Sequence, residues 1–373
     1  MRTAIRLTIL IFGICSMDCL PAAKDDSLIN KRIESFTAVL SFFPPNVKDT
    51  TEANIIKQQL LQFIDSLYNL EQRGVLPLDE QYYLWMGKLY HFAYNLNVPG
   101  AWKKSEVFYK SALQRDPKSI EGRMALSAHY ANSWDPGDTS SYERLDKGYS
   151  LLKSIYRDGN DTLNPALYSN MLLFGVCFHS KAICYDAMYK FMKYCPDDTN
   201  INTFRSMIGS IKDNHIQMQR NKTTITYENK IAKFKVRYPD DFLLFSEDHD
   251  QNKQGIGILM LETPMTETDR DYSIRNSISI IATPTKIASA SEVTQRFFNR
   301  IQMAKDSVRS INRAQAQSYY FSSRFGEPEK YQGITTIIKA GNYVYQISYM
   351  ATASTFTKNL NFYLTFEQSL TLL

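Results

Sequence analysis

Residues 83–117 read Tyr83-Leu-Trp-Met-Gly87-Lys-Leu-Tyr90 and, after an insert, Ser105-Glu-Val-Phe-Tyr109-Lys-Ser-Ala112-Leu-Gln-Arg-Asp-Pro117. Apolar residues recur three or four positions apart in both parts, which predicts two short amphipathic helices. Small residues, Gly87 and Ala112, stand where the helices would cross, and Tyr90 and Tyr109 would fill the space beside them. Pro117 would end the second helix, because its ring cannot continue the helical hydrogen bonds. The stretch therefore predicts a closely packed helical hairpin.

This spacing resembles the tetratricopeptide repeat, a helix-turn-helix unit of about 34 residues. The matching positions are Tyr83, Met86, Gly87 and Tyr90, then Ser105, Tyr109, Ala112 and Asp116-Pro117. A second unit carries Leu126, Ser127 and Tyr130, then Gly148, Leu152 and Ile155, and a less regular third unit covers 165–196. The first unit departs from the repeat consensus in its longer spacing between Gly87 and Ser105. The resemblance covers residues 80–196 and implies an α-helical solenoid with a groove that receives peptides.

Helices are also expected on both sides of this solenoid. The stretch from Phe36 to Phe43 could be a helix that ends at Pro44-Pro45, or an edge strand. A helix is predicted over 51–73, capped by Asp49 or Thr51, and would cover the open end of the solenoid. A helix over 201–220 would cover the other end. We therefore expect an N-terminal segment and capping helix at 24–75 and helical repeats at 76–220.

The hydrophobic period changes from helical to alternating at residues 221–224. Strands are predicted at 234–239, 255–261, 277–283, 315–322, 333–339 and 343–349, with a hairpin turn at Gly341-Asn342. The capping box Ser289-Ala-Ser-Glu292 predicts a helix between strands, and Phe356, Leu360, Tyr363, Phe366 and Leu370 mark a final helix. This order resembles the PsbP-like fold over 224–373. The resemblance implies an antiparallel sheet packed with helices that binds another protein.

The N-terminus has the layout of a secretory signal. Arg2 and Arg6 precede an apolar core over 7–14, and the small residues of Pro21-Ala-Ala23 follow. A signal peptide at 1–23 predicts an exported protein, periplasmic or secreted. The less favoured alternatives are a lipoprotein anchored through Cys15 or Cys19, and an uncleaved anchor. No later segment is apolar for long enough to cross a membrane.

The sequence does not contain the known catalytic motifs. The five histidines are scattered, no His-Glu-x-x-His, Gly-x-Ser-x-Gly or phosphate-binding glycine loop is present, and the net charge of +5 is spread along the chain. We therefore expect no enzyme, cofactor, metal or nucleic-acid partner, because nucleic-acid binding needs a concentrated basic surface.

Three cysteines follow the predicted signal peptide, at 177, 184 and 195. Only Cys177 and Cys184 could form a disulfide, since Cys184 and Cys195 would lie too far apart on one helix. The favoured alternative is three buried thiols that act as small apolar side chains.

Partner-binding residues are expected on the first helices of the solenoid, by the register of the repeat. They are Gln81, Leu84, Lys88, His91, Glu121, Met124 and Ala128. Segment 24–50 could instead fill part of this groove. The sequence thus predicts a non-enzymatic adaptor that binds partner proteins. The alternative is a module that binds a small ligand or metal in a pocket on the tyrosine-rich sheet with Tyr319, Tyr343 and Tyr345. Convergent charged groups would favour the pocket, and a filled core would favour the adaptor.

Overall fold

The computed structural model describes residues 27–41, 45–135, 138–159, 165–211, 216–246, 254–263, 276–300, 303–311, 314–324 and 330–373. The expected signal peptide at 1–23 and its alternatives at Cys15 and Cys19 lie outside the described residues. The chain divides into two compact units. The first runs to Cys177 and includes Lys193–Pro196, and the second comprises Phe178–Met192 and Asp197–Leu373.

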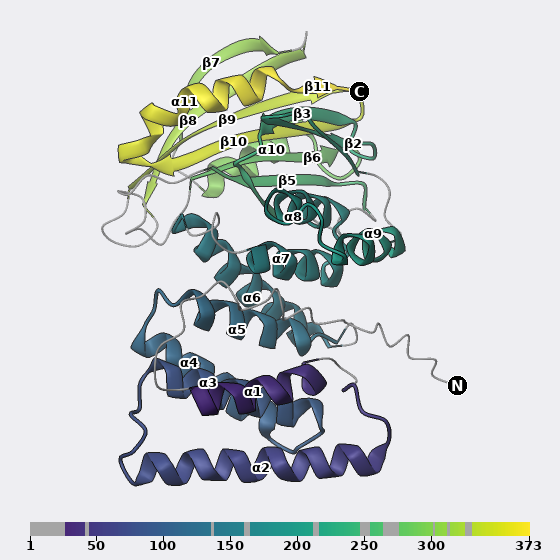
Figure 1. The fold of residues 1–373 in the computed structure, drawn as a ribbon. Helices are drawn as coiled ribbons and strands as arrows, with labels where there is room; N and C mark the ends of the chain where they lie inside the picture. The colour runs from purple at the N-terminus through teal and green to yellow at the C-terminus, as the bar shows by residue number, and fades with distance from the viewer. Residues whose placement is uncertain are drawn as a thin grey trace. The chain divides into compact units, whose positions relative to one another are not determined.

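The described part of the first unit is helical (Figure 1). Its helices are α1 (Ser27–Leu40), α2 (Thr50–Gln72), α3 (Glu80–Asn95), α4 (Ala101–Arg115), α5 (Ile120–Asn132), α6 (Thr139–Arg157) and α7 (Pro165–Cys177). The ambiguous stretch that starts at Phe36 begins inside α1 and is therefore helical up to Leu40. The helix predicted over 51–73 is confirmed as α2. Its cap is Asp49, whose Oδ1 accepts from the backbone N–H groups of Thr51 and Glu52 at 2.8 and 2.9 Å.

The hairpin of α3 and α4 is packed as closely as its small residues predict. A Cβ atom on Gly87 would lie 2.5 Å from Cδ1 of Tyr109. The Ser105 hydroxyl donates to the Gly87 carbonyl at 2.8 Å, so the two backbones meet at this point. Gly148 on α6 is similarly enclosed, since a Cβ there would lie 2.7 Å from Phe174 Cζ on α7 and 3.2 Å from the Ser127 carbonyl oxygen on α5. The paired helices are thus present, and membership of the tetratricopeptide family stays a prediction.

Helices α1 and α2 cover α3. Their buried side chains pack in one cluster with the apolar side of α3, and this cluster includes Ile33, Phe36, Leu40, Leu60, Ile64, Leu67, Trp85, Met86 and Leu89. Two polar contacts fix α1 in place. The Trp85 indole donates to Asn30 Oδ1 at 2.8 Å, and the Asn95 amide donates to the Leu40 carbonyl at 2.8 Å. The N-terminal segment therefore forms part of the helical core.

The second unit contains helices α8 (Lys181–Tyr194, except its last two residues), α9 (Asn200–Ser210), α10 (Ala290–Arg300) and α11 (Ala353–Gln368). Four described strands form one antiparallel sheet in the order β1 (Ile216–Arg220), β2 (Thr224–Asn229), β3 (Phe234–Pro239) and β11 (Thr371–Leu372). Seven others form a larger antiparallel sheet. Its order is β4 (Leu243–Ser246), β5 (Gly257–Glu262), β6 (Ser277–Pro284), β10 (Tyr343–Thr352), β9 (Lys330–Ala340), β8 (Ala314–Arg324) and β7 (Met303–Ile311).

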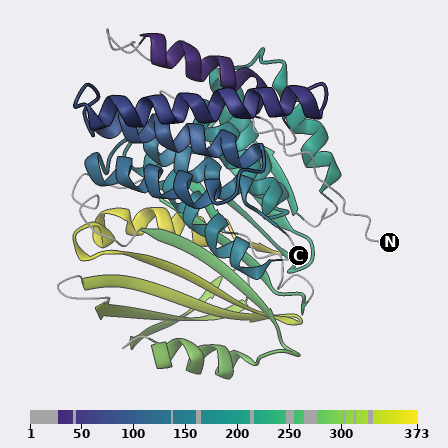
Figure 2. The same ribbon diagram turned by 90° about the horizontal axis from the view of Figure 1, so that it is seen from below.

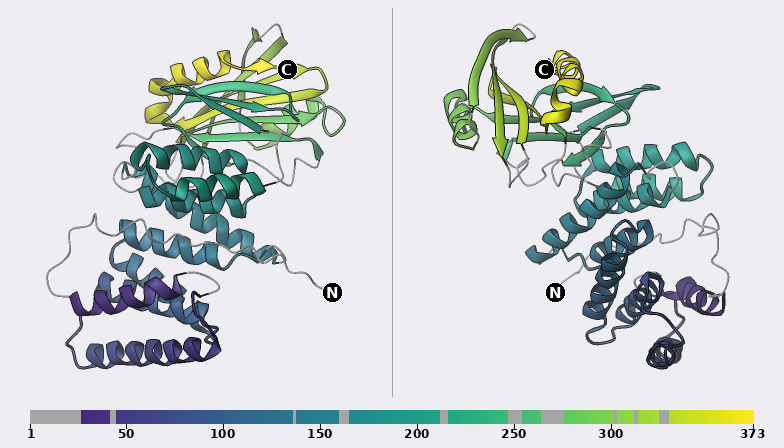
Figure 3. Two further views of the ribbon diagram at one scale, coloured as in Figure 1. Left: turned by 45° about the vertical axis from the view of Figure 1, so that its right-hand side comes forward. Right: turned by 90° about the vertical axis from the view of Figure 1, so that its left-hand side faces the viewer.

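Helices α10 and α11 lie on opposite faces of the larger sheet (Figure 2). Alternating side chains of β8, β9 and β10 explain the two faces. One set, which includes Tyr319, Phe321, Ile337 and Val344, packs against Val293 and Phe297 of α10. The other set faces α11, where the Tyr363 hydroxyl lies 3.0 Å from Thr336 Oγ1. On that face α11 also contacts β3 of the smaller sheet (Figure 3).

Two local predictions in this unit are confirmed. The backbone N–H of Ser289 donates to Glu292 Oε2 at 2.7 Å and that of Glu292 to Ser289 Oγ at 3.3 Å, which is the expected capping box of α10. Gly341 has φ of +54° in the turn between β9 and β10. The helix predicted over 201–220 is wrong in its second half, because α9 ends at Ser210 and 216–220 form strand β1, paired with β2.

The expected limits of the domains, 24–75, 76–220 and 224–373, stay predictions. The compact units divide the chain elsewhere, since most of α8, all of α9 and β1 belong with the sheets. The broad architecture of the expectation agrees with the structure: helical hairpins come first, and antiparallel sheets packed with helices follow.

Candidate functional site

The residues predicted to bind a partner lie on α3 and α5, but they do not form one uniform surface. Leu84 is 4% exposed and packs in a core cluster with Tyr109 and Leu126. His91 is 8% exposed. The remaining five are half-buried: Gln81, Lys88, Glu121, Met124 and Ala128. We call these five the α3/α5 surface, because they alone among the predicted residues retain access to solvent.

The charges of the α3/α5 surface are Lys88 and Glu121. Burial lowers the pKa of Lys88, and the negative charges of Glu121 and of Glu34 on α1 offset part of this effect. Burial likewise raises the pKa of Glu121, and the charge of Lys88 offsets part of that shift. Within the described part of the chain, neither side chain forms an ion pair or side-chain hydrogen bond. Both charged groups are therefore partly shielded from water and can still form an ion pair or a hydrogen bond with a partner.

Behind this surface lies a buried polar network that the sequence did not predict. His91 Nδ1 lies 3.0 Å from His129 Nδ1, and Asn132 Nδ2 lies 3.1 Å from His91 Nε2. An amide nitrogen can only donate, so His91 Nε2 accepts, and the proton of the neutral ring is on Nδ1 and is donated to His129. Burial, followed by the charge of Lys88, lowers the pKa of His91 to about 4. His91 is thus a neutral structural residue near pH 7.

The network continues into α1. The Asn132 amide also donates to Asn95 Oδ1 at 3.0 Å, and Asn95 in turn bonds the carbonyl of Leu40. His129 is further fixed by the indole of Trp102, whose ring stacks on it with centroids 5.0 Å apart. Trp102 is the second residue of α4 and lies within the long spacing between Gly87 and Ser105. Its ring packs against the core cluster of Leu84 and Tyr109.

The cysteines are thiols. No disulfide joins Cys177 and Cys184, and both are buried. Burial raises the pKa of Cys177 to about 12, so its reactive thiolate form is suppressed. The possible disulfide is therefore not formed in this structure, which agrees with the alternative of buried apolar thiols.

A buried ion cluster connects α8 to the smaller sheet. Asp186 Oδ2 lies 3.0 Å from Lys190 Nζ, and Asp186 Oδ1 lies 2.7 Å from Arg220 Nη2 on β1. Lys190 also donates to the carbonyl of Phe242 at 3.3 Å. The three charged side chains are 11% exposed or less. The cluster explains why α8 belongs to the second unit, and the sequence offered only the Asp186–Lys190 spacing as a signal for it.

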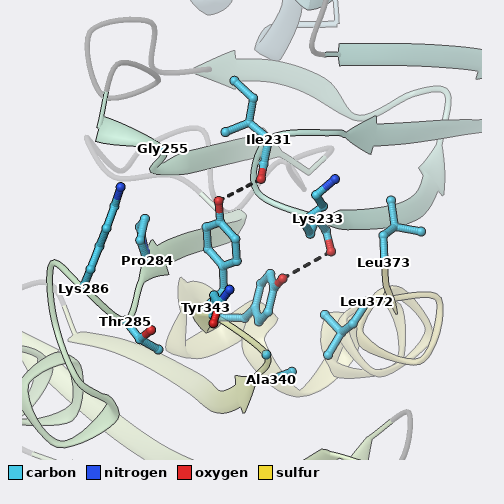
Figure 4. Close-up of a pocket in the computed structure, with 13 residues that line it drawn as sticks. Ile231, Lys233, Gly255, Pro284, Thr285, Lys286, Ala340, Tyr343, Leu372 and Leu373 are labelled. Carbon is cyan, nitrogen blue, oxygen red and sulfur yellow. Dashed lines mark hydrogen bonds between the residues drawn. The ribbon is translucent and has the colours of Figure 1, made fainter.

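The second unit also contains an open pocket of about 760 Å³ between the ends of the two sheets (Figure 4). It is formed by the turn between β2 and β3, the loop between β6 and α10, the β9–β10 hairpin and strand β11. Its lining residues are Ile231, Lys233, Gly255, Pro284, Thr285, Lys286, Ala340, Gly341, Asn342, Tyr343, Tyr345, Leu372 and Leu373. The pocket thus combines apolar walls with two lysines.

The tyrosines of the pocket hold its walls in place. Tyr343 donates to the carbonyl of Ile231 at 2.8 Å, and Tyr345 donates to those of Ala232 and Lys233 at 3.0 and 3.2 Å (Figure 4). Both hydroxyl groups are therefore already used within the protein. Tyr319, the third tyrosine expected there, instead packs edge-on against Phe298 under α10, with centroids 5.0 Å apart.

Neither a metal centre nor a membrane span is found in the described part of the chain. Among the described residues, no group of three or more His, Cys, Asp or Glu side chains could hold a metal ion. None of the helices in the described ranges combines the length and the apolar character that crossing a bilayer requires.

Comparison with known proteins gave partial structural likenesses. No family model matches the chain, and no curated protein matches it. Among solved structures, PsbP (CyanoP) from Synechocystis sp. PCC 6803 has a TM-score of 0.32 at 10% identity, over 41% of this chain and 95% of that one. LpqN, involved in cell envelope biogenesis of Mycobacterium tuberculosis, has a TM-score of 0.28 at 14% identity, over 43% and 93%. A Bacteroides thetaiotaomicron VPI-5482 structure scores 0.25 at 17% identity, over 38% and 46%. A PsbP structure is thus among the partial matches, and these scores support no functional conclusion.

Proposed function

We propose that the protein is a non-enzymatic adaptor of an exported compartment, periplasmic or secreted, that binds partner proteins. In this proposal the helical hairpins are tetratricopeptide-like and bind a partner segment on the α3/α5 surface. The sheet unit is PsbP-like and binds a second partner or another part of the same complex.

The observation that supports the proposal is the pair Lys88 and Glu121. They are opposite charges on neighbouring helices, partly desolvated, and neither is used in an ion pair within the described residues. A partner peptide offers both donors and acceptors along its backbone, so it could satisfy both groups at once. Such partly desolvated charge contacts are stronger than fully exposed ones. Met124 and Ala128 add apolar surface on α5, the helix that carries Glu121.

Site-specific photo-crosslinking tests this proposal. A photoreactive phenylalanine analogue at Gln81 or Met124 should capture one partner in stoichiometric amount from an extract of the source organism. The same analogue at Val107, which is 61% exposed on α4, is the control and should not capture it. Lys88→Ala combined with Glu121→Ala should abolish the crosslink. Equal capture from Val107, or no capture from either surface position, would contradict the proposed site.

A second candidate function is a small-ligand-binding module that uses the pocket beside Tyr343 and Tyr345. The observation that favours it is the presence of Lys233 and Lys286 at a pocket of about 760 Å³, a size typical of ligand sites. The core under α11 is filled by buried side chains, among them Tyr349, Tyr363 and Phe366, and this favours the adaptor. Purification of the chain with a bound metabolite but without a partner would favour the second candidate.

A further inference from the structure

The lining of the pocket in the second unit includes basic but no acidic side chains. Lys233 and Lys286 line it, and none of the lining residues is an aspartate or glutamate. Within the described ranges, neither lysine forms an ion pair. Two cations that share a concave site raise the local concentration of anions. The free charge therefore points to a negatively charged ligand.

The position of Lys233 is fixed by strained backbone. Its φ is +56°, in the left-handed region that residues with a side chain rarely adopt. Its carbonyl accepts from Tyr345 at 3.2 Å and from the backbone N–H of Leu373 at 2.9 Å, so two bonds hold the turn in this conformation. Such strain persists where the surroundings determine the backbone, and it often marks ligand sites.

The opposite side of the pocket carries Lys286 and two uncharged polar side chains, Thr285 and Asn342. The two segments that bear them, the loop between β6 and α10 and the turn between β9 and β10, are joined, because the backbone N–H of Thr285 donates to the carbonyl of Asn342 at 2.8 Å. These groups supply neutral hydrogen bonds beside the lysines. The polar edge thus offers donors from two separate loops whose positions are set before a ligand binds.

The rest of the pocket is apolar or aromatic. Tyr343 presents its half-buried ring, since its hydroxyl group is bonded to the turn between β2 and β3. Tyr345 is bonded to the same turn and is only 2% exposed. Ile231, Pro284 and Leu372 extend this wall. An inorganic ion would leave the apolar wall in contact with water, whereas a ligand with an apolar body would cover it.

We propose that this pocket binds a small amphiphilic anion, with a carboxylate or phosphate head group held by Lys233 or Lys286 and an apolar body against Tyr343. The inference rests on the second candidate function and adds the chemical class of the ligand. It does not depend on the partner-binding role of the α3/α5 surface.

Calorimetric titration of the full chain tests the proposal with three probes. Cinnamate carries a carboxylate, phenyl phosphate carries a phosphate, and cinnamamide is the neutral isostere of cinnamate. At least one anion should bind saturably at low salt, and cinnamamide should bind roughly tenfold more weakly than cinnamate or not at all. The anion that binds more tightly identifies the head group.

Variants connect the binding to the pocket. Lys233→Gln combined with Lys286→Gln should weaken anion binding by roughly tenfold or more. Ala340→Trp, which fills the pocket from the β9 side, should also weaken it. Lys358→Gln removes one positive charge from an exposed site on α11 and should leave binding unchanged. Circular dichroism of each variant confirms that the fold is retained.

The possible results test the anionic class of the ligand separately from the small-ligand-binding function. If cinnamamide binds as tightly as cinnamate and the lysine variants bind normally, the anionic class is overturned while a small-ligand function stands. If Lys358→Gln weakens binding as much as the lysine pair, the effect is one of net charge, and the site is overturned. If no probe binds, both the ligand class and the second candidate function are overturned.

Discussion

The ring of Tyr109 on α4 occupies the space that a side chain at Gly87 on α3 would need. A Cβ at position 87 would lie 2.5 Å from Tyr109 Cδ1 and 2.6 Å from Cε1. Tyr109 is only 4% exposed, so its ring is enclosed by the surrounding helices. The glycine therefore sets the distance between the two helices.

Gly87→Ala should destabilise the protein by about 1–3 kcal/mol, because the added methyl group forces the buried ring or the helix backbone to shift. Urea unfolding followed by circular dichroism measures the change. Gly209→Ala is the matched control, since nothing lies within 4 Å of a Cβ at this helical glycine. The control should be neutral or stabilising by up to roughly 1 kcal/mol. Equal effects of the two variants would show that α3 and α4 are not nested.

Asp186→Asn should destabilise the protein by about 3–5 kcal/mol, since it leaves Lys190 and Arg220 as neighbouring cations at a buried site without their carboxylate. Denaturant unfolding at pH 7 measures the loss. Glu143→Gln is the control, because it breaks the exposed contact of Glu143 with Lys147 at 2.7 Å, whose side chains are 71% and 59% exposed. No measurable change is expected there. A mild effect at Asp186 would mean that the cluster does not hold α8 to the sheet.

The same carboxylate predicts a response to acid. Burial alone would raise the pKa of Asp186, but the charges of Lys190 and Arg220 outweigh it, so the pKa lies below the ordinary value. The stabilisation is complete above the pKa of about 4 in the unfolded chain and is lost as the pH falls through the lower folded value. Wild-type stability should therefore decrease below about pH 4 more steeply than that of Asp186→Asn. Parallel pH curves for the two proteins would refute the assignment.

His91 predicts a loss of stability in a different pH range. Its folded pKa of about 4 lies below the ordinary value of 6.5, so the unfolded ring binds a proton more readily. Stability is complete above about pH 6.5 and falls as the pH decreases toward 4, by up to roughly 3 kcal/mol from this group. His91→Gln should flatten the decrease in unfolding free energy between pH 7 and pH 5. His179→Gln, at an exposed histidine, should retain the wild-type slope.

A cut at residues 221–223 should not release two separate folded pieces. These exposed residues connect β1 to β2, which remain paired from Ile216–Asn229 to Arg220–Ile225. Arg220 on one side of the cut is also bonded to Asp186 of α8. After cleavage at an engineered protease site there, both fragments should co-elute in size-exclusion chromatography. Separate elution of two folded fragments would instead support a domain boundary at 221–224.

Structural features that depend on a few neighbouring residues were predicted correctly from the sequence. The cap at Asp49, the capping box of Ser289 and Glu292, and the turn at Gly341 depend on local hydrogen bonds and φ angles. The sequence displays these requirements directly. The close approach at Gly87 was also predictable, because glycine weakens a helix interior and is favoured there where a neighbouring helix leaves no room for a side chain.

Strands that depend on pairing with a neighbouring strand were not predicted. Strand β1 is only five residues long, and it is a strand because β2 pairs with it. Strand β7, with the polar sequence Met-Ala-Lys-Asp-Ser-Val-Arg-Ser-Ile, likewise depends on β8. Strand β1, Ile-Gln-Met-Gln-Arg, has only two apolar residues, too few for their spacing to decide between a strand and the end of a helix.

The candidate sites likewise combine residues that the sequence predicted with contacts that it could not show. The register of α3 placed Lys88 and Gln81 on a half-buried surface, but it could not show that Leu84 turns into the core or that His91 meets His129 from another helix. The expected tyrosines included Tyr343 and Tyr345 of the pocket. The two lysines were missed, because they come from separate loops that only the folded sheets bring to one place.

The chain passes from one compact unit to the other after Cys177, after Met192 and again after Pro196. Neither unit is thus encoded by one uninterrupted stretch. A single crossover in the gene could not exchange either unit intact for that of another protein. The two units are therefore expected to be inherited together, and a chimaera would need matched segments on both sides of α8.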